Sequence, residues 1–130
     1  MVFIGERQSP IPAYVVNDVG GRSVLTQNDT CIENGQEIPA YRVDRYQKLI
    51  IDSSESVNVQ GQSKDLVSWF KPQNEDIFKT SANKFNYNFT EVGCQSVEMT
   101  LEDTAASKST KTKIWFNVIN ALPTLDNLLM

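Results

Sequence analysis

The side chains that could support chemistry in this chain of 130 residues are two cysteines, scattered carboxylates and many serines, because the sequence contains no histidine. Histidine is the side chain most used as a general base near neutral pH, and it is the commonest metal ligand. No serine has an evident substitute base, since Ser63 and Ser107 are each followed directly by a lysine and adjacent side chains point apart in a strand. The sequence therefore predicts a protein that is not an enzyme.

The two cysteines, Cys31 and Cys94, are too few for a thiolate zinc site without imidazole partners. Two alternatives remain: a disulfide, or two small buried thiols in a reducing compartment. A disulfide closing a loop of this length would contribute about 4 kcal/mol by restricting the unfolded chain. We expect the disulfide.

Carboxylates are numerous enough for a calcium site at a loop, since Ca²⁺ binds several converging oxygens. None has the Asp-x-Asp-x-Asp-Gly spacing of a dedicated loop, and no spacing selects a pair of acids for glycoside hydrolysis. Solvated or turn-capping roles are favoured, so no cofactor is expected and calcium is the alternative. The carboxylates considered for calcium are Asp52, Glu55, Asp65, Glu75, Asp76, Glu102 and Asp103.

The length of 130 residues and the hydrophobic content of 40% fit one compact domain. The formal charge of −4 is spread with no basic cluster to neutralise a row of phosphates, so nucleic acid is not an expected partner. No apolar run approaches the ~20 residues that cross a bilayer, and membrane insertion is not expected. The first residues lack the regions of a secretory signal. Because the fold inferred below suggests export, residue 1 is interpreted as a start inside a longer protein.

Short runs rich in Val, Ile, Thr, Tyr and Phe recur between clusters of Gly, Asn, Asp, Ser and Pro, a spacing typical of an antiparallel sandwich. Residues 13–16 and 23–26 are expected to form a hairpin, and Asn34-Gly35 indicates a sharp turn. Residues 73–84 have a weak pattern that fits a loop or a short strand. No segment repeats apolar side chains at helical spacing, so almost no helix is expected.

Three runs, at 85–89, 97–101 and 112–119, alternate clearly and each place apolar side chains on one face. These faces are expected to form the core, and the alternation leaves Trp115 on the opposite face. The expected core comprises Ile51, Val67, Trp69, Phe85, Tyr87, Phe89, Val97, Met99, Leu101, Ile114, Phe116 and Val118.

The order of elements in the second half of the chain is that of a known family. An aromatic strand and a glycine-containing turn at 85–93 precede an alternating strand at 97–103, a small polar loop at 107–109 and a final β-branched strand at 114–118. This order resembles the polycystic-kidney-disease (PKD) repeat.

Upstream, residues 49–56 resemble the family's strand that enters an Asp/Ser-rich turn, and residues 66–69 resemble its strand with a core tryptophan. The sequence departs from the family after Trp69, because residues 70–76 lack the glycine-rich turn that follows the tryptophan in PKD repeats. A bacterial immunoglobulin-like or fibronectin-type domain is the nearest alternative.

The resemblance covers roughly residues 43–120 and implies an all-β, immunoglobulin-like (PKD-like) antiparallel β-sandwich. Residues 1–42 would then be an N-terminal strand or hairpin elaboration of a single domain that spans residues 1–120. Residues 121–130 would be a linker or the start of a following repeat.

Aromatic side chains supply the candidate binding surface. A tryptophan on the middle strand of such a sandwich usually fills the space between the sheets, so Trp69 is expected in the core. The outward Trp115 could be covered by the N-terminal elaboration or a neighbouring repeat, which is the favoured interpretation, or could be a flat platform for a sugar ring or a protein. Tyr41, Tyr46 and Phe70 are weaker candidates for the same surface.

The resemblance implies a non-enzymatic spacer module, one of a tandem array in an extracytoplasmic, secreted or cell-surface protein, that contributes to adhesion or assembly. Its partners would be neighbouring repeats of the same chain or other surface proteins. The alternative function is an accessory module that binds carbohydrate or protein through exposed aromatic side chains.

Overall fold

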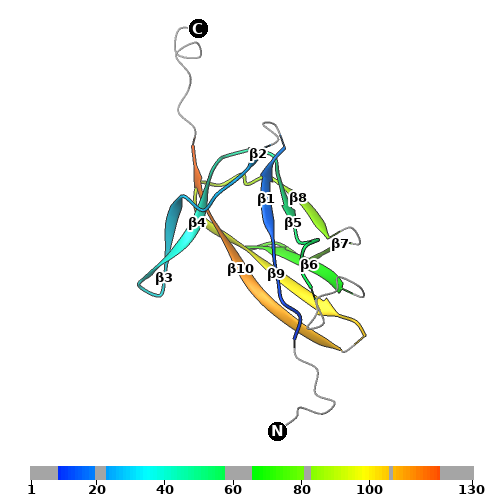
Figure 1. Ribbon diagram of the computed structural model, residues 1–130. Helices are drawn as coiled ribbons and strands as arrows, with labels where there is room; N and C mark the ends of the chain where they lie inside the picture. Colours follow the sequence, from blue (N-terminus) through cyan, green and yellow to red (C-terminus); the bar gives the residue numbers. More distant parts are fainter. Residues whose placement is uncertain (1–8, 20–22, 58–65, 81–82, 106, 121–130) are drawn as a thin grey trace, which may run out of the picture.

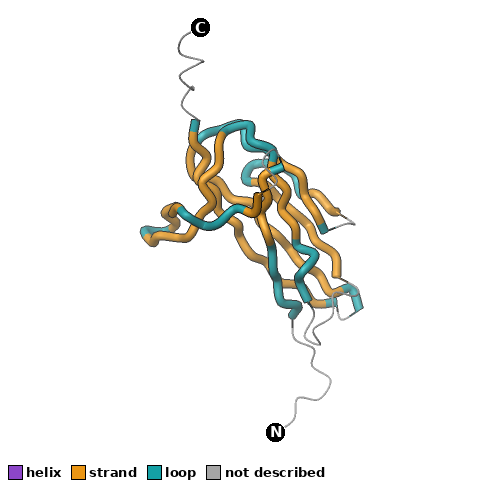
Figure 2. Tube along the Cα trace, turned by 45° about the horizontal axis from the view of Figure 1, so that its top comes forward, coloured by secondary structure: helices purple, strands orange, loops and turns teal. Residues whose placement is uncertain are grey.

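The computed structural model describes residues 9–19, 23–57, 66–80, 83–105 and 107–120. Within these ranges the chain forms two sheets and contains no helix (Figures 1 and 2), so no helix there is long and apolar enough to cross a membrane. The expected all-β sandwich is confirmed.

The smaller sheet has four strands in the order β2-β1-β5-β8, and the larger sheet has six in the order β3-β4-β10-β9-β6-β7. The strands of the smaller sheet are β1 (Val15–Asp18), β2 (Ser23–Val24), β5 (Leu49–Asp52) and β8 (Lys84–Tyr87). The strands of the larger sheet are β3 (Asp29–Glu33), β4 (Gln36–Asp44), β6 (Leu66–Pro72), β7 (Phe78–Thr80), β9 (Gly93–Asp103) and β10 (Lys108–Ile119).

The long hairpin of β9 and β10 is the centre of the larger sheet. Its antiparallel register runs from Lys108 opposite Asp103 to Val118 opposite Gly93, and β6 pairs with the other edge of β9. The alternation of apolar and polar side chains along both strands suits a sheet that is buried on one face only.

The N-terminal strands belong to both layers. The predicted hairpin is present as β1 and β2, and β1 also pairs with β5. In the larger sheet β4 pairs in parallel with β10, with Phe116 opposite Tyr41, which departs from the expected wholly antiparallel sandwich. The parallel direction is possible because no hairpin joins β4 to β10. After β4, residues 45–48 carry the chain to β5 in the other sheet.

The turn between β3 and β4 is the one that Asn34-Gly35 predicts. Both residues have positive φ, at 52° for Asn34 and 79° for Gly35. Two-residue hairpin turns with positive φ match the twist of their strands, and Asn-Gly is the dipeptide that adopts them most readily. The turn lets the β3–β4 hairpin project from the side of the sandwich (Figure 1).

The core lies between the sheets and is rich in aromatic rings. Phe116 is fully buried, with its ring centroid 4.8 Å from that of Phe89 and 5.5 Å from that of Tyr41. Tyr87 is partly buried and packs against this cluster. The other expected core residues that are buried are Ile51, Phe85, Val97, Met99, Leu101, Ile114 and Val118.

The expected core positions of Val67 and Trp69 are wrong. Along β6 the buried side chains are those of Leu66, Ser68, Phe70 and Pro72, whereas Val67 and Trp69 face away from the other sheet and are partly exposed. Phe70 has no exposed surface and its ring is parallel to that of Phe85, with 5.1 Å between centroids. This stacking, together with the pairing of Phe70 opposite the buried Met99, sets the phase of the strand.

Candidate functional site

The face of the larger sheet that points away from the core carries both tryptophans, and we call it the outer face. The register places Trp69 on β6 opposite Thr100 on β9, and Thr100 opposite Lys111 on β10. The side chains on the outer face are Val67, Trp69 and Lys71 on β6, Ser96, Glu98, Thr100 and Glu102 on β9, and Ser109, Lys111, Lys113, Trp115 and Asn117 on β10.

An open depression of about 370 Å³ lies on the outer face beside Trp69. Trp69 and Ile77 provide its apolar surface, and Ile77 is 50% exposed. Its polar lining consists of the side chains of Thr100, Glu102, Ser109 and Lys111. The depression therefore joins an aromatic ring to two hydroxyls, a carboxylate and an ammonium group.

This lining has the composition of a small-molecule site, in which an apolar surface provides contact area and a few polar groups fix the orientation of the ligand. Hydroxyls donate and accept hydrogen bonds, carboxylates accept them and ammonium groups donate them. The four polar side chains can thus pair with hydroxyl groups around a ligand ring that lies against the indole.

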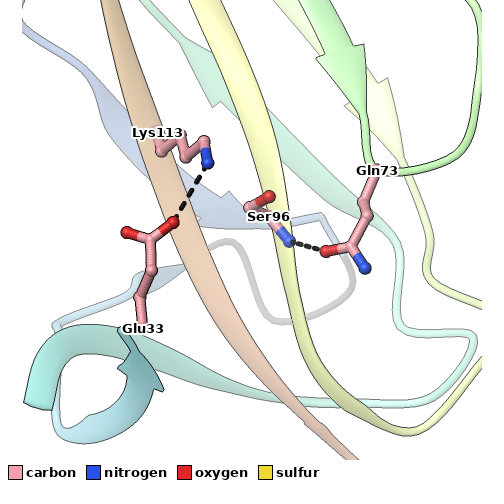
Figure 3. A network of polar contacts seen from close by, with 4 residues as sticks. All are labelled: Glu33, Gln73, Ser96 and Lys113. Carbon is pink, nitrogen blue, oxygen red and sulfur yellow. Dashed lines mark hydrogen bonds and ion pairs between the residues drawn. The ribbon is translucent and has the colours of Figure 1, made fainter. Parts of the chain in front are cut away.

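The other end of the outer face is built around Trp115, which lies on β10 opposite Ser96 and is partly exposed. The Nζ atom of Lys113 is 5.9 Å from the centroid of the Trp115 ring. Lys113 Nζ also donates a hydrogen bond of 3.0 Å to Glu33 Oε2 on β3, and the Ser96 N–H donates one of 3.3 Å to Gln73 Oε1 (Figure 3).

Strand β3 borders the Trp115 end of the outer face. The disulfide between Cys31 on β3 and Cys94 on β9 joins Cα atoms 5.8 Å apart, which confirms the expected bond. Asn117 Nδ2 donates a hydrogen bond of 3.0 Å to Asp29 Oδ2. Hydrogen bonds from the Thr30 N–H and then from Asn117 hold the pKa of the Asp29 carboxyl below its usual value.

Of the four residues expected on a binding surface, Trp115 alone is on the outer face, since Tyr46 lies in the turn after β4. Phe70 is fully buried, and Tyr41 is only 6% exposed because its ring packs on Phe116, so both expectations are wrong. Burial raises the pKa of Tyr41 to about 12.

Sequence reasoning missed the depression because it placed Trp69 in the core. A signal was present in Lys71, which shares a strand face with Trp69 and cannot be buried without a partner for its charge. The contributions of Thr100, Ser109 and Lys111 depend on the pairing of three strands, which local alternation does not reveal.

A second concavity, of about 460 Å³, lies at one end of the smaller sheet. It is lined by Val19, Lys48, Leu49, Ile50, Asn86, Tyr87 and Asn88. The Tyr87 hydroxyl donates a hydrogen bond to Glu75, and burial raises the pKa of that phenol. Tyr87 is the single aromatic side chain in this lining, and it also packs against the core.

Among the described residues, no group of three cysteine, aspartate or glutamate side chains converges as a metal site. Asp65, one of the carboxylates considered for calcium, lies outside the described residues.

No protein-family profile and no curated protein matches this sequence. The fold is similar to that of a solved structure concerned with the promiscuous specificity of carbohydrate-binding modules from the beta-sandwich superfamily, with a TM-score of 0.58 and 13% sequence identity. The match covers 89% of this chain and 36% of the other, so this chain spans about a third of that protein's length. At this identity the likeness shows a shared β-sandwich fold.

Proposed function

We propose that this chain is a non-enzymatic carbohydrate-binding module and that a sugar ring binds in the outer-face depression, stacked on Trp69. The observation that carries the proposal is the lining of that depression, in which Trp69 and Ile77 stand beside Thr100, Glu102 and Lys111. A pyranose has apolar C–H faces and a rim of hydroxyls, so it matches an aromatic surface surrounded by donors and acceptors.

The charges on the outer face favour a sugar over a protein as the ligand. Protein interfaces bury about 800 Å² on each partner, and their centres are depleted in charged side chains. Here Glu102 and Lys111 line the depression, and the Lys111 ammonium is 4.0 Å from the Glu98 carboxylate. Such charged groups suit hydrogen bonds to hydroxyls that keep part of their water shell.

The fold supports the same class of ligand, since the similar solved structure concerns modules that bind carbohydrate. The disulfide agrees with an oxidising, extracytoplasmic location, where polysaccharides and glycoproteins are available as ligands.

The proposal is tested by titrating the protein with cello-, chito- and xylo-hexasaccharide while tryptophan fluorescence and heat are recorded. We expect at least one of these sugars to bind and Trp69→Ala to weaken its binding by about tenfold or more, the value of one lost aromatic contact. Tyr46→Ala is the matched control, because Tyr46 is an aromatic residue that is 58% exposed and lies outside β6, β9 and β10. Equal affinities of the wild type and Trp69→Ala would reject the site.

The spacer function is a second proposal, favoured by the course of the chain through the sandwich. The described chain begins at one end of the two layers, and β10 ends at the opposite end (Figure 1). Domains joined in this way extend head to tail. Small-angle scattering of a two-module tandem should give a maximum dimension close to twice that of one module.

A further inference from the structure

Trp115 lies on the same face as Trp69 but outside the depression, so its place in binding depends on how far apart the two rings are. Trp69 lies opposite Thr100, Thr100 lies opposite Lys111, and Trp115 is four residues farther along β10 than Lys111. From strand spacing and rise per residue, the two Cα atoms are about 17 Å apart. This distance is longer than one sugar ring and is within reach of a short oligosaccharide.

The surface between the two tryptophans is polar and belongs to a single sheet. The direct path from Trp69 to Trp115 crosses β9 in the region of Glu98 and Thr100, beside Lys113 on β10. These side chains offer hydrogen-bond donors and acceptors to the hydroxyls of a chain that lies across the strands.

The hairpin of β3 and β4 marks the far end of this path. Beyond Trp115, the disulfide and the hydrogen bond from Asn117 to Asp29 hold β3 against the outer face. The ion pair between Lys113 and Glu33 holds the Lys113 ammonium over the Trp115 ring, 5.9 Å from its centroid. The path thus begins at Trp69 and ends at the disulfide-bonded β3–β4 hairpin, and Trp115 is the last aromatic residue along it.

We infer that the ligand is an extended glycan chain whose separate sugar rings stack on Trp69 and on Trp115, rather than a monosaccharide or a single terminal sugar. This inference rests on the proposed function and adds to it the length of the ligand and a second stacking position. The two rings act together only when one chain is long enough to reach both.

The experiment is a calorimetric titration with cello-, chito- and xylo-oligosaccharides, each as a series from monosaccharide to hexasaccharide. For a series that binds, we expect affinity to rise by about tenfold once the chain is long enough to contact both rings. Trp115→Ala should remove this rise and leave the affinity for the shortest binding sugars unchanged. Trp115→Tyr, which keeps an aromatic ring, should restore most of the rise, and Tyr46→Ala should not alter the series.

The results separate the inference from the function on which it rests. If sugars bind and Trp69→Ala weakens them, but affinity is independent of length or the rise persists in Trp115→Ala, the extended-chain inference is overturned and the proposed function stands. If no sugar binds at any length, both are rejected. A circular dichroism spectrum and an unfolding curve for each variant distinguish loss of a contact from loss of the fold.

Discussion

Two adjacent aromatic residues, Trp69 and Phe70, divide the roles of core and surface between them. Phe70 is fully buried against Phe85, whereas Trp69 is partly exposed and lines the depression. Neighbouring side chains in a strand must point to opposite faces, so one of these rings had to leave the core. The one that remained is the ring with no polar atom to satisfy.

The effects of Phe70→Ala and Trp69→Ala on stability test whether Phe70 lies in the core and Trp69 on the surface. We expect Phe70→Ala to lower the free energy of unfolding by about 3–5 kcal/mol, because it leaves a cavity between the sheets. Trp69→Ala should cost about 1 kcal/mol, since a partly exposed side chain leaves a gap that water can fill. Urea unfolding of both variants measures the difference, and equal losses would contradict the observed phase of β6.

At the scale of the element, the β3–β4 hairpin is attached to the sandwich by the parallel pairing of β4 with β10 and by a few contacts of β3. It projects from the side of the sandwich (Figure 1), and one covalent bond, one ion pair and one side-chain hydrogen bond join β3 to β9 and β10. The ion pair and the hydrogen bond involve exposed or half-exposed groups and contribute little, so the disulfide is the strongest of these three contacts of β3.

Removal of the disulfide should therefore destabilise the whole fold. Its cysteines are 63 residues apart, and restricting a loop of that length in the unfolded chain corresponds to about 4 kcal/mol. We expect the double variant Cys31→Ser, Cys94→Ser to lose about this much in urea unfolding. Wild-type protein unfolded with and without a reducing agent is the control. A loss below about 1 kcal/mol would contradict the prediction that the disulfide contributes substantially to the stability of the fold.

For the whole molecule, both sheets contribute rings to one aromatic core, and two of its phenols are held in their neutral form. Burial raises the pKa of Tyr41 to about 12 and also raises that of Tyr87. The ordinary pKa of a tyrosine phenol in an unfolded chain is about 10. The folded state thus binds the phenolic protons more tightly than the unfolded state.

This linkage predicts that stability falls at alkaline pH. Below about pH 10 the folded and unfolded states both keep the Tyr41 proton, so the contribution of Tyr41 to the free energy of unfolding is fully present. Between about pH 10 and pH 12 the unfolded state alone loses the proton, so the free energy of unfolding declines. Tyr41→Phe keeps the ring and removes the ionisation, so its unfolding free energy should fall less steeply over this range. Urea unfolding at a series of pH values measures both slopes, and identical slopes would contradict the prediction.

The sequence by itself determined the all-β class, the Asn34-Gly35 turn, the outward position of Trp115 and most of the core on β9 and β10. Period-two alternation carries this information wherever apolar side chains occupy one phase of a strand and polar ones the other. Only the tertiary structure decided the phase of β6, because Val67 and Trp69 in one phase compete with Leu66 and Phe70 in the other. Stacking on Phe85 and the register with β9 resolved that competition, and the same register brought Trp69 together with Thr100 and Lys111.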